Sequence, residues 1–188
     1  MAADRKRLDE YPLEAGVDPL AADFDRSLGE LALSGTRIQV ERAADALAEL
    51  ARAETEASET EARPPLPAHG WTLVLLGRAA GRLGDINRAA ECFRMVTSLA
   101  GEGMDPRHPV ILSAHYDEAV RCADIGNTRQ AASLLAPVLD RAPLDHGRPA
   151  LDEAHPVLAG ARALAERLGV SVPYATTRPD EASLDIDA

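Results

Sequence analysis

Two arginines, Arg78 and Arg82, are the residues whose type and spacing best suit the binding of a charged ligand. They are four residues apart, so a helix would place them on one side. A guanidinium group can hold a carboxylate through two parallel hydrogen bonds, and the rings of Trp71 and Tyr116 would add apolar contact area. The pattern therefore suggests capture of a carboxylate-bearing segment.

A second interpretation gives these arginines no ligand. Arg78 and Arg82 could be solvated, or they could form ion pairs with Asp85 and Asp124. Exposed ion pairs of this kind contribute little to stability or binding. Trp71 could equally belong to an apolar core. The sequence alone leaves both interpretations open.

Residue types that support catalysis or metal binding are scattered. The histidines, none of which forms a close helical pair of metal ligands, are His69, His108, His115, His146 and His155. The densest group of acids and histidines lies within residues 145–155. Cys92 and Cys122 have no neighbouring histidine and are expected to be buried and reduced. The glycine-rich run at residues 77–84 lacks the Lys-Ser/Thr ending of a phosphate loop. We therefore predict no catalytic residue, no metal site and no cofactor.

The elements that position these side chains are expected to be helices. Aromatic residues make up only 3% of the chain, while alanine and leucine are abundant. Close packing of small side chains must then supply most of the core, as it does between helices that approach closely. This composition favours an all-α fold.

Composition divides the chain into five segments. They are a flexible acidic arm (residues 1–17), a degenerate helical pair (18–57), a Pro/Glu-rich linker (58–68), helical repeats with a terminal capping helix (67–169) and a disordered acidic tail (170–188). Proline bars the continuation of a helix and favours an extended residue before it, which marks the linker. Acidic sequence with few apolar residues favours disorder in the tail.

A self-match at a spacing of 42 residues organises the central segment. The matching residues are Pro67, Gly84, Ala89, Phe93 and Val96, which recur in order as Pro109, Gly126, Ala131, Leu135 and Val138. A repeat of this size is typical of stacked helix pairs. A glycine is expected to end the first helix of each unit, and Asp85 and Asn127 are placed to cap the second. Pro137 should bend its helix or end it early.

A last helix is expected to begin near His155-Pro156 and to end near Leu168-Gly169. This helix has no partner helix after it in the chain. A single terminal helix is a common way for a helical array to cover its last apolar face.

The first unit resembles the tetratricopeptide repeat. Leu76-Gly77, Gly84, Ala89 and Phe93 follow that family's pattern of a Leu-Gly pair, a glycine at the turn, and then alanine and phenylalanine in the second helix. The 42-residue spacing and the His-Pro openings are similar to the longer kinesin-light-chain type, which is common in bacterial proteins. The likeness covers residues 67–169.

The second unit matches less closely. Gly126, Ala131 and Pro143 keep the pattern, whereas Ala119 replaces the glycine of the first helix and Leu135 replaces the phenylalanine. Small residues at these positions would independently allow two helices to approach closely.

The resemblance implies a right-handed stack of antiparallel helix pairs, an α-solenoid of about seven helices whose first helices line a concave groove. The residues expected to face this groove are Trp71, Val74, Arg78 and Arg82 from the first unit, Ser113, Tyr116, Val120 and Asp124 from the second, and Arg162, with Arg167 as its alternative, from the last helix. In the family such a face binds an extended peptide or a helix of another protein.

The charge distribution excludes some classes of partner. The formal net charge is −11, and residues 1–66 alone hold 8 basic and 15 acidic groups. Nucleic-acid affinity comes largely from basic groups that displace counterions, so we expect no nucleic-acid partner. The sequence has no secretory signal and no apolar run that could span a bilayer, so we expect a cytoplasmic protein with no membrane partner.

These observations predict a non-enzymatic adaptor or scaffold that binds another protein or a peptide, acidic or with a free carboxylate. Two alternatives stay open: a peptide-responsive regulator or sensor, and a biosynthetic enzyme or accessory protein that binds a small ligand. Residues 180–187 form an acidic, partly apolar peptide that could occupy the groove of its own or a neighbouring molecule. The amino-terminal helices could also support a homodimer.

Overall fold

Helices form all the regular structure in the part of the chain that the computed structural model describes, which is residues 35–61, 67–140, 151 and 155–170. The elements are α3 (Arg37–Glu61), α4 (Pro67–Leu83), α5 (Ile86–Ser98), the 3₁₀-helix η1 (Leu99–Glu102), α6 (Pro109–Asp124), α7 (Thr128–Leu139) and α8 (Pro156–Arg167). The prediction of an all-α fold is confirmed. Among these helices, none is both long enough and apolar enough to cross a membrane.

The turns between paired helices follow from glycine and from a capping side chain. Gly84 and Gly126 have φ angles of 85° and 79°, a left-handed conformation that favours glycine because it has no Cβ. The side chains of Asp85 and Asn127 then each accept a hydrogen bond from the backbone amide three residues further on, at 3.0 and 3.2 Å. The predicted turns and caps are therefore confirmed.

Two histidines begin helices, as predicted. The Nδ1 atoms of His108 and His155 accept hydrogen bonds from the amides two residues further on, at 3.2 and 3.3 Å. Pro109 and Pro156 follow them at the first helical position, where proline has no amide hydrogen to leave unsatisfied. This capping role explains why a His-Pro pair opens each of these helices.

Some helix ends differ from the predicted boundaries. Helix α3 continues to Glu61, so the linker predicted to begin at residue 58 begins later. Serine, threonine and glutamate tolerate a helix, and only Pro64 and Pro65 bar its continuation. Helix α7 ends at Leu139, two residues after Pro137, in agreement with an early end. The arm, the helix expected within residues 18–33, the tail after Val170 and Asp145, His146, Asp152 and Glu153 of the acid–histidine group lie outside the described residues.

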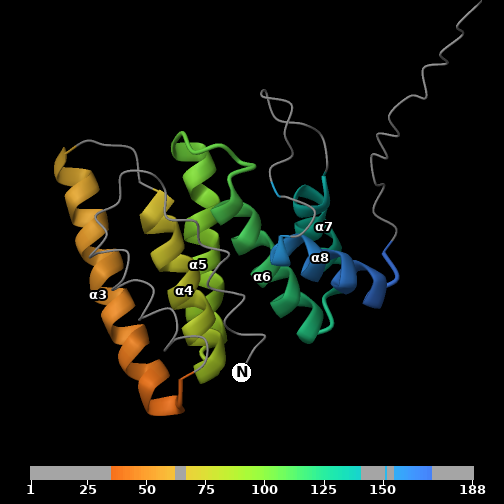
Figure 1. Cartoon of the computed structure of the whole chain (residues 1–188), viewed down its shortest axis with the longest axis horizontal. Coiled ribbons are helices and arrows are strands. Elements are labelled where there is room, and N and C mark those ends of the chain that lie inside the picture. Colours follow the sequence, from red (N-terminus) through yellow and green to blue (C-terminus); the bar gives the residue numbers. More distant parts are fainter. Residues whose placement is uncertain (1–34, 62–66, 141–150, 152–154, 171–188) are drawn as a thin grey trace, which may run out of the picture.

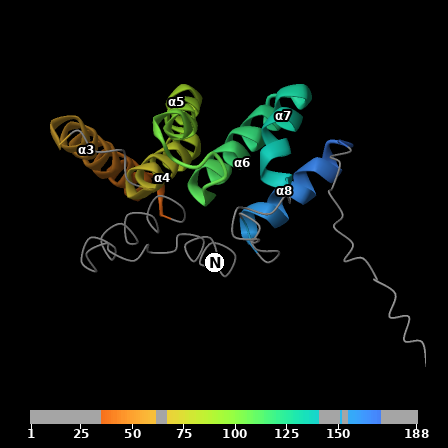
Figure 2. The same cartoon turned by 90° about the horizontal axis from the view of Figure 1, so that it is seen from above.

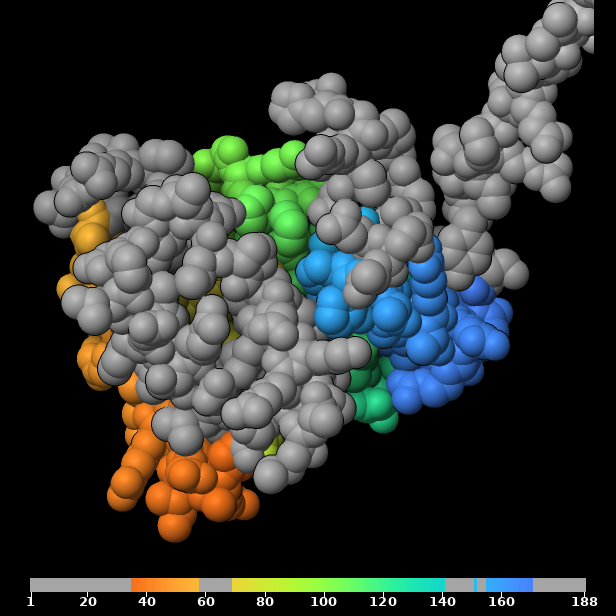
Figure 3. Space-filling model, in the orientation of Figure 1, coloured from red at the N-terminus to blue at the C-terminus, as the bar shows by residue number. Residues whose placement is uncertain are grey.

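Successive helices pack on one another in chain order (Figure 1). Helix α4 packs on α3, α5 and α6, and α6 packs on α4, α5, α7 and α8. Figure 2 shows the consequence: α4, α6 and α8 follow one another on one side, with α5 and α7 on the other. Helices α3 and α8 lie at opposite ends of the molecule (Figure 3).

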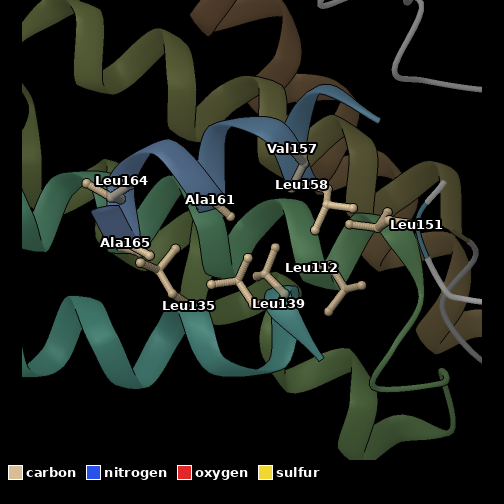
Figure 4. Close-up of a cluster of buried hydrophobic side chains, with 11 residues drawn as sticks. Leu112, Leu135, Leu139, Leu151, Val157, Leu158, Ala161, Leu164 and Ala165 are labelled. Carbon is tan, nitrogen blue, oxygen red and sulfur yellow. The ribbon is translucent and has the colours of Figure 1, made fainter. Parts of the chain in front are cut away.

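The core is a chain of three apolar clusters between neighbouring helices. The first lies mainly between α3 and α4, with Val40 and Leu47, and includes Cys92 of α5, while Ile38 of α3 is exposed. The second joins α4, α5 and α6 and includes Ala51 of α3. The third joins α6, α7 and α8 around Leu135 and Leu158 (Figure 4). Each cluster contains residues of three or four helices, so no single helix pair buries its own apolar surface.

Two glycines set how closely the helices approach. A Cβ added at Gly77 of α4 would lie 2.6 Å from Cε1 of Phe93 in α5. A Cβ added at Gly160 of α8 would overlap the phenolic oxygen of Tyr116 in α6. The aromatic rings occupy the space that any larger residue would need, which explains the Gly and Phe of the repeat pattern in the first unit.

The contact at Gly77 can be tested against a second glycine of the same helix. We expect Gly77→Ala to lower the free energy of unfolding by about 1–2 kcal/mol, because the new methyl group overpacks the Phe93 ring. At Gly81 an added Cβ would make only ordinary contact, 4.0 Å from Ala89 Cβ. Gly81→Ala should therefore raise stability by about 0.5–1 kcal/mol through helix propensity.

Urea denaturation of both variants gives the comparison. Equal stabilisation by the two substitutions would contradict the account of Gly77, because it would show that the helices do not need this close approach.

Candidate functional site

One side of α4 carries a stripe of larger side chains. Trp71, Leu75, Arg78 and Arg82 are spaced by four, three and four residues, so they lie along one side of the helix. Gly77 and the other glycines point toward α5 and α6. The stripe therefore lies on the side of α4 that faces away from α5.

The 42-residue offset maps this stripe onto α6. Its equivalents are Ser113, Asp117, Val120 and Asp124, which have the same spacing. Because α4 and α6 pack side by side, the two stripes form one surface, which we call the shared face. It includes six of the nine predicted groove residues.

The two stripes are joined by an ion pair. Arg78 Nε donates a hydrogen bond to Asp117 Oδ2 at 2.6 Å, and the two side chains are only 10% and 15% exposed. Asp117 was not among the partners considered from the sequence, which were Asp85 and Asp124. Asp117 lies on the facing helix, a relation that spacing along one helix cannot reveal. Arg78 consequently fixes α4 to α6 and is not free to anchor a ligand.

The end of the shared face at the carboxyl termini of α4 and α6, which we call its open end, is polar and more exposed to solvent. Arg82 is exposed, and its Nη2 donates to the backbone carbonyl of Gly35 at 3.0 Å. Asp124 lies 3.9 Å from Nη2 of Arg167 in α8, and both side chains are largely exposed. An exposed pair at this distance contributes little, so both groups can exchange partners at small cost.

Three predicted groove residues lie elsewhere. Val74 is fully buried in the cluster between α4, α5 and α6. Tyr116 packs between α6 and α8 against Gly160. Arg162 is about 200° around α8 from Gly160, so it lies on a different side of that helix from the residue that meets α6. Its alternative, Arg167, is the arginine of α8 that approaches α6.

Two residues of the shared face were missed by the sequence reasoning. Leu75 and Asp117 occupy equivalent positions in the two units. Applying the 42-residue offset to every position of the first helix, rather than to the repeat signature alone, would have found both. Leu75 is 5% exposed and packs against the α3–α4 cluster, while Trp71 is half-buried against the α4–α5–α6 cluster.

Ser113 is the unusual polar residue of this face. Its side chain is 0% exposed, and among the described residues its hydroxyl has no hydrogen-bond partner. An unsatisfied buried hydroxyl costs about 1–3 kcal/mol. The Ser113 hydroxyl therefore lowers the stability of the fold, and an alanine at this position would not.

The thiols are poorly suited to nucleophilic chemistry. Burial raises the pKa of Cys92 to about 11, and burial followed by the Glu118 carboxylate raises the pKa of Cys122. Both thiols are therefore protonated near neutral pH, and the thiolate is the reactive form. Across the described ranges, no three His, Cys, Asp or Glu side chains group in a way that could hold a metal ion.

His115 couples stability to pH. Its Nδ1 is buried without a hydrogen-bond partner among the described residues, and burial lowers its pKa. The unfolded chain therefore binds a proton more readily than the folded one, and stability must fall as the pH drops below about 6.5, until the folded-state pKa is reached.

The Arg78–Asp117 pair should behave as a coupled unit. We expect Arg78→Ala or Asp117→Ala to lower the free energy of unfolding by about 2–3 kcal/mol, because each leaves a largely buried charge alone. The double variant should lose about 1–3 kcal/mol less than the sum of the two single losses. Additive losses in urea denaturation would contradict a direct contact.

An exposed ion pair provides the matched control for this cycle. Arg37 and Glu41 are 3.1 Å apart, with side chains 77% and 49% exposed. Substituting either should change stability by about 0.5 kcal/mol or less.

Substitution of His115 should make the free energy of unfolding depend less on pH below neutrality. We expect His115→Gln to reduce the loss of stability between pH values of about 7.5 and 5, because a glutamine does not take up a proton there. Urea midpoints measured across this range provide the test. An unchanged slope in His115→Gln would assign the pH dependence to other groups.

Comparison with known proteins gives no relative for this arrangement. No protein-family model matches the chain, and no match was found among curated proteins or solved structures. A functional assignment therefore depends on the residues of this chain alone.

Proposed function

We propose that this chain is a non-enzymatic protein-interaction module that binds a peptide or a helix of a partner protein along the shared face. The scaffold we propose is a tetratricopeptide-like, right-handed stack of antiparallel helix pairs. The 42-residue match, the Gly77–Phe93 contact and the row formed by α4, α6 and α8 support it. Stacked pairs of this kind bring equivalent sides of successive first helices into one surface.

The main support for the proposal is the set of polar and aromatic side chains on the shared face. Equivalent positions in two units hold a half-buried Trp71 and an exposed Arg82 on α4, and a buried Ser113 and an exposed Asp124 on α6. The apolar clusters between the described helices form the core, and Arg82 and Asp124 of this row lie outside them. Aromatic and arginine side chains are those that dominate the energy of protein interfaces.

The charge layout defines the ligand. Arg78 is engaged with Asp117, and Arg82 is the exposed cation at the carboxyl-terminal end of the α4 stripe. A carboxylate would make a stronger, charge-assisted bond with this guanidinium than a neutral carbonyl makes. The ligand we propose is therefore an apolar peptide or helix with a carboxylate near Arg82 and an apolar side chain against Trp71.

Selection from a displayed peptide library, followed by affinity measurement on the full chain, tests this proposal. We expect the selected peptides to contain a carboxylate together with spaced apolar residues. Arg82→Glu should weaken their binding by about tenfold or more, because a charge-assisted contact becomes a repulsion.

The matched control is Arg94→Glu, which makes the same charge change at an exposed position of α5, on the opposite side of the molecule. It should leave affinity within about twofold of wild type. The proposal would be contradicted if no peptide binds, or if both charge reversals weaken binding equally.

A further inference from the structure

Gly35, the first residue that the structure describes, lies beside Arg82 at the open end of the shared face. Gly35 precedes α3, and its carbonyl accepts the hydrogen bond from Arg82 at 3.0 Å. The next residue, Thr36, donates its amide to the side chain of Gln39 at 2.8 Å, which starts α3 at this point. The 34 residues before Gly35 are therefore tethered beside the shared face.

The last part of that tether has the pattern of an amphipathic helix. Leu20, Phe24, Leu28 and Leu31 are spaced by four, four and three residues, and they follow a proline at residue 19 that suits a helix start. A helix over residues 19–33 would be about 22 Å long. This is close to the length of α6, so the segment could run along the whole shared face.

The shared face has properties that fit such an occupant. Helix α4 packs on α3, α5 and α6, and Leu75 of the stripe is buried in the cluster between α3 and α4. Trp71 of α4 and Val120 of α6 are only partly buried. They offer apolar area that an apolar helix lying on the shared face would cover.

Charge favours the same pairing at one end of the shared face. Residues 18–34 contain four acidic groups and one basic group, and Arg82 is the exposed cation of the α4 stripe, whereas Arg78 is paired with Asp117. The acidic tail is a weaker match, because residues 171–188 contain no apolar stripe at helical spacing and start beyond α8, away from Arg82.

We propose that residues 18–34 form an amphipathic helix that occupies the shared face between α4 and α6 and competes with an incoming partner. Attachment at Gly35 keeps the local concentration of this segment in the millimolar range, about 1 mM, so modest intrinsic affinity is sufficient for occupancy. A partner that displaces it must carry the same chemistry, an acidic helix with an apolar stripe. This regulatory role rests on the proposed function, whereas the docking itself does not.

Trp71 reports the docking directly, because it is the only tryptophan of the chain and lies in the α4 stripe. In the full chain, Phe24→Asp/Leu28→Asp should shift the Trp71 emission maximum to longer wavelength and increase its quenching by acrylamide. Ala22→Asp/Arg26→Asp, on the opposite side of the same predicted helix, should keep the wild-type spectrum. Unchanged emission and quenching in the stripe variant would overturn the proposal.

A second measurement leaves the apolar stripe intact and so does not depend on a destabilised variant. A nitroxide attached to Ala22→Cys should broaden the amide signals of α4 and α6 but not those of α5 and α7. The native Cys92 and Cys122 are buried and should resist labelling. Broadening elsewhere, or none, would overturn the docking. A chain ending at Val170 should retain the broadening, and its loss would identify the tail as the occupant instead.

Competition is measured with a peptide selected on the full chain. Removing an occupant raises the fraction of molecules that can bind, so Phe24→Asp/Leu28→Asp should tighten peptide binding by about tenfold or more. Unchanged affinity would overturn the competition. Failure of the peptide selection would remove the proposed function, while the Trp71 and nitroxide results would still decide whether residues 18–34 dock.

Discussion

The close approach of helices at small residues is the constraint on which the rest of this structure depends. Gly77 allows α4 to lie against the ring of Phe93, and Gly160 allows α8 to lie against Tyr116. At such separations the helices bury apolar surface with few aromatic residues. Gly70 allows α4 to approach α6 as well, because a Cβ there would lie 3.0 Å from Cγ2 of Val110. Arg78 and Asp117 form their 2.6 Å hydrogen bond across the same two helices.

Each cluster of the core extends across more than one helix pair, so stability and function share the same contacts. Arg78 contributes to both, since it lies on the shared face and holds α4 to α6. A ligand that drew Arg78 away from Asp117 would leave a carboxylate largely buried and alone, at a cost of about 2–3 kcal/mol. Binding through the exposed Arg82 avoids that cost, which is why the proposal places the ligand's carboxylate there.

Local features of this chain were predictable from the sequence, and contacts between helices were not. Glycine turns and the caps at Asp85 and Asn127 follow from residues within one short segment, and they were predicted correctly. The pairing of Arg78 with Asp117 was not predicted, because Asp117 lies 39 residues away on another helix. The burial of Val74 likewise depends on how α6 is rotated against α4, which no spacing within α4 specifies.

The central claim is that the shared face is the binding surface, and amide chemical shifts measured on titration with a selected peptide test it most directly. The account predicts that the largest changes occur in α4 and α6, between residues 71 and 82 and between 113 and 124, together with the indole signal of Trp71. Changes concentrated in α5 and α7, on the opposite side of the molecule, would contradict it.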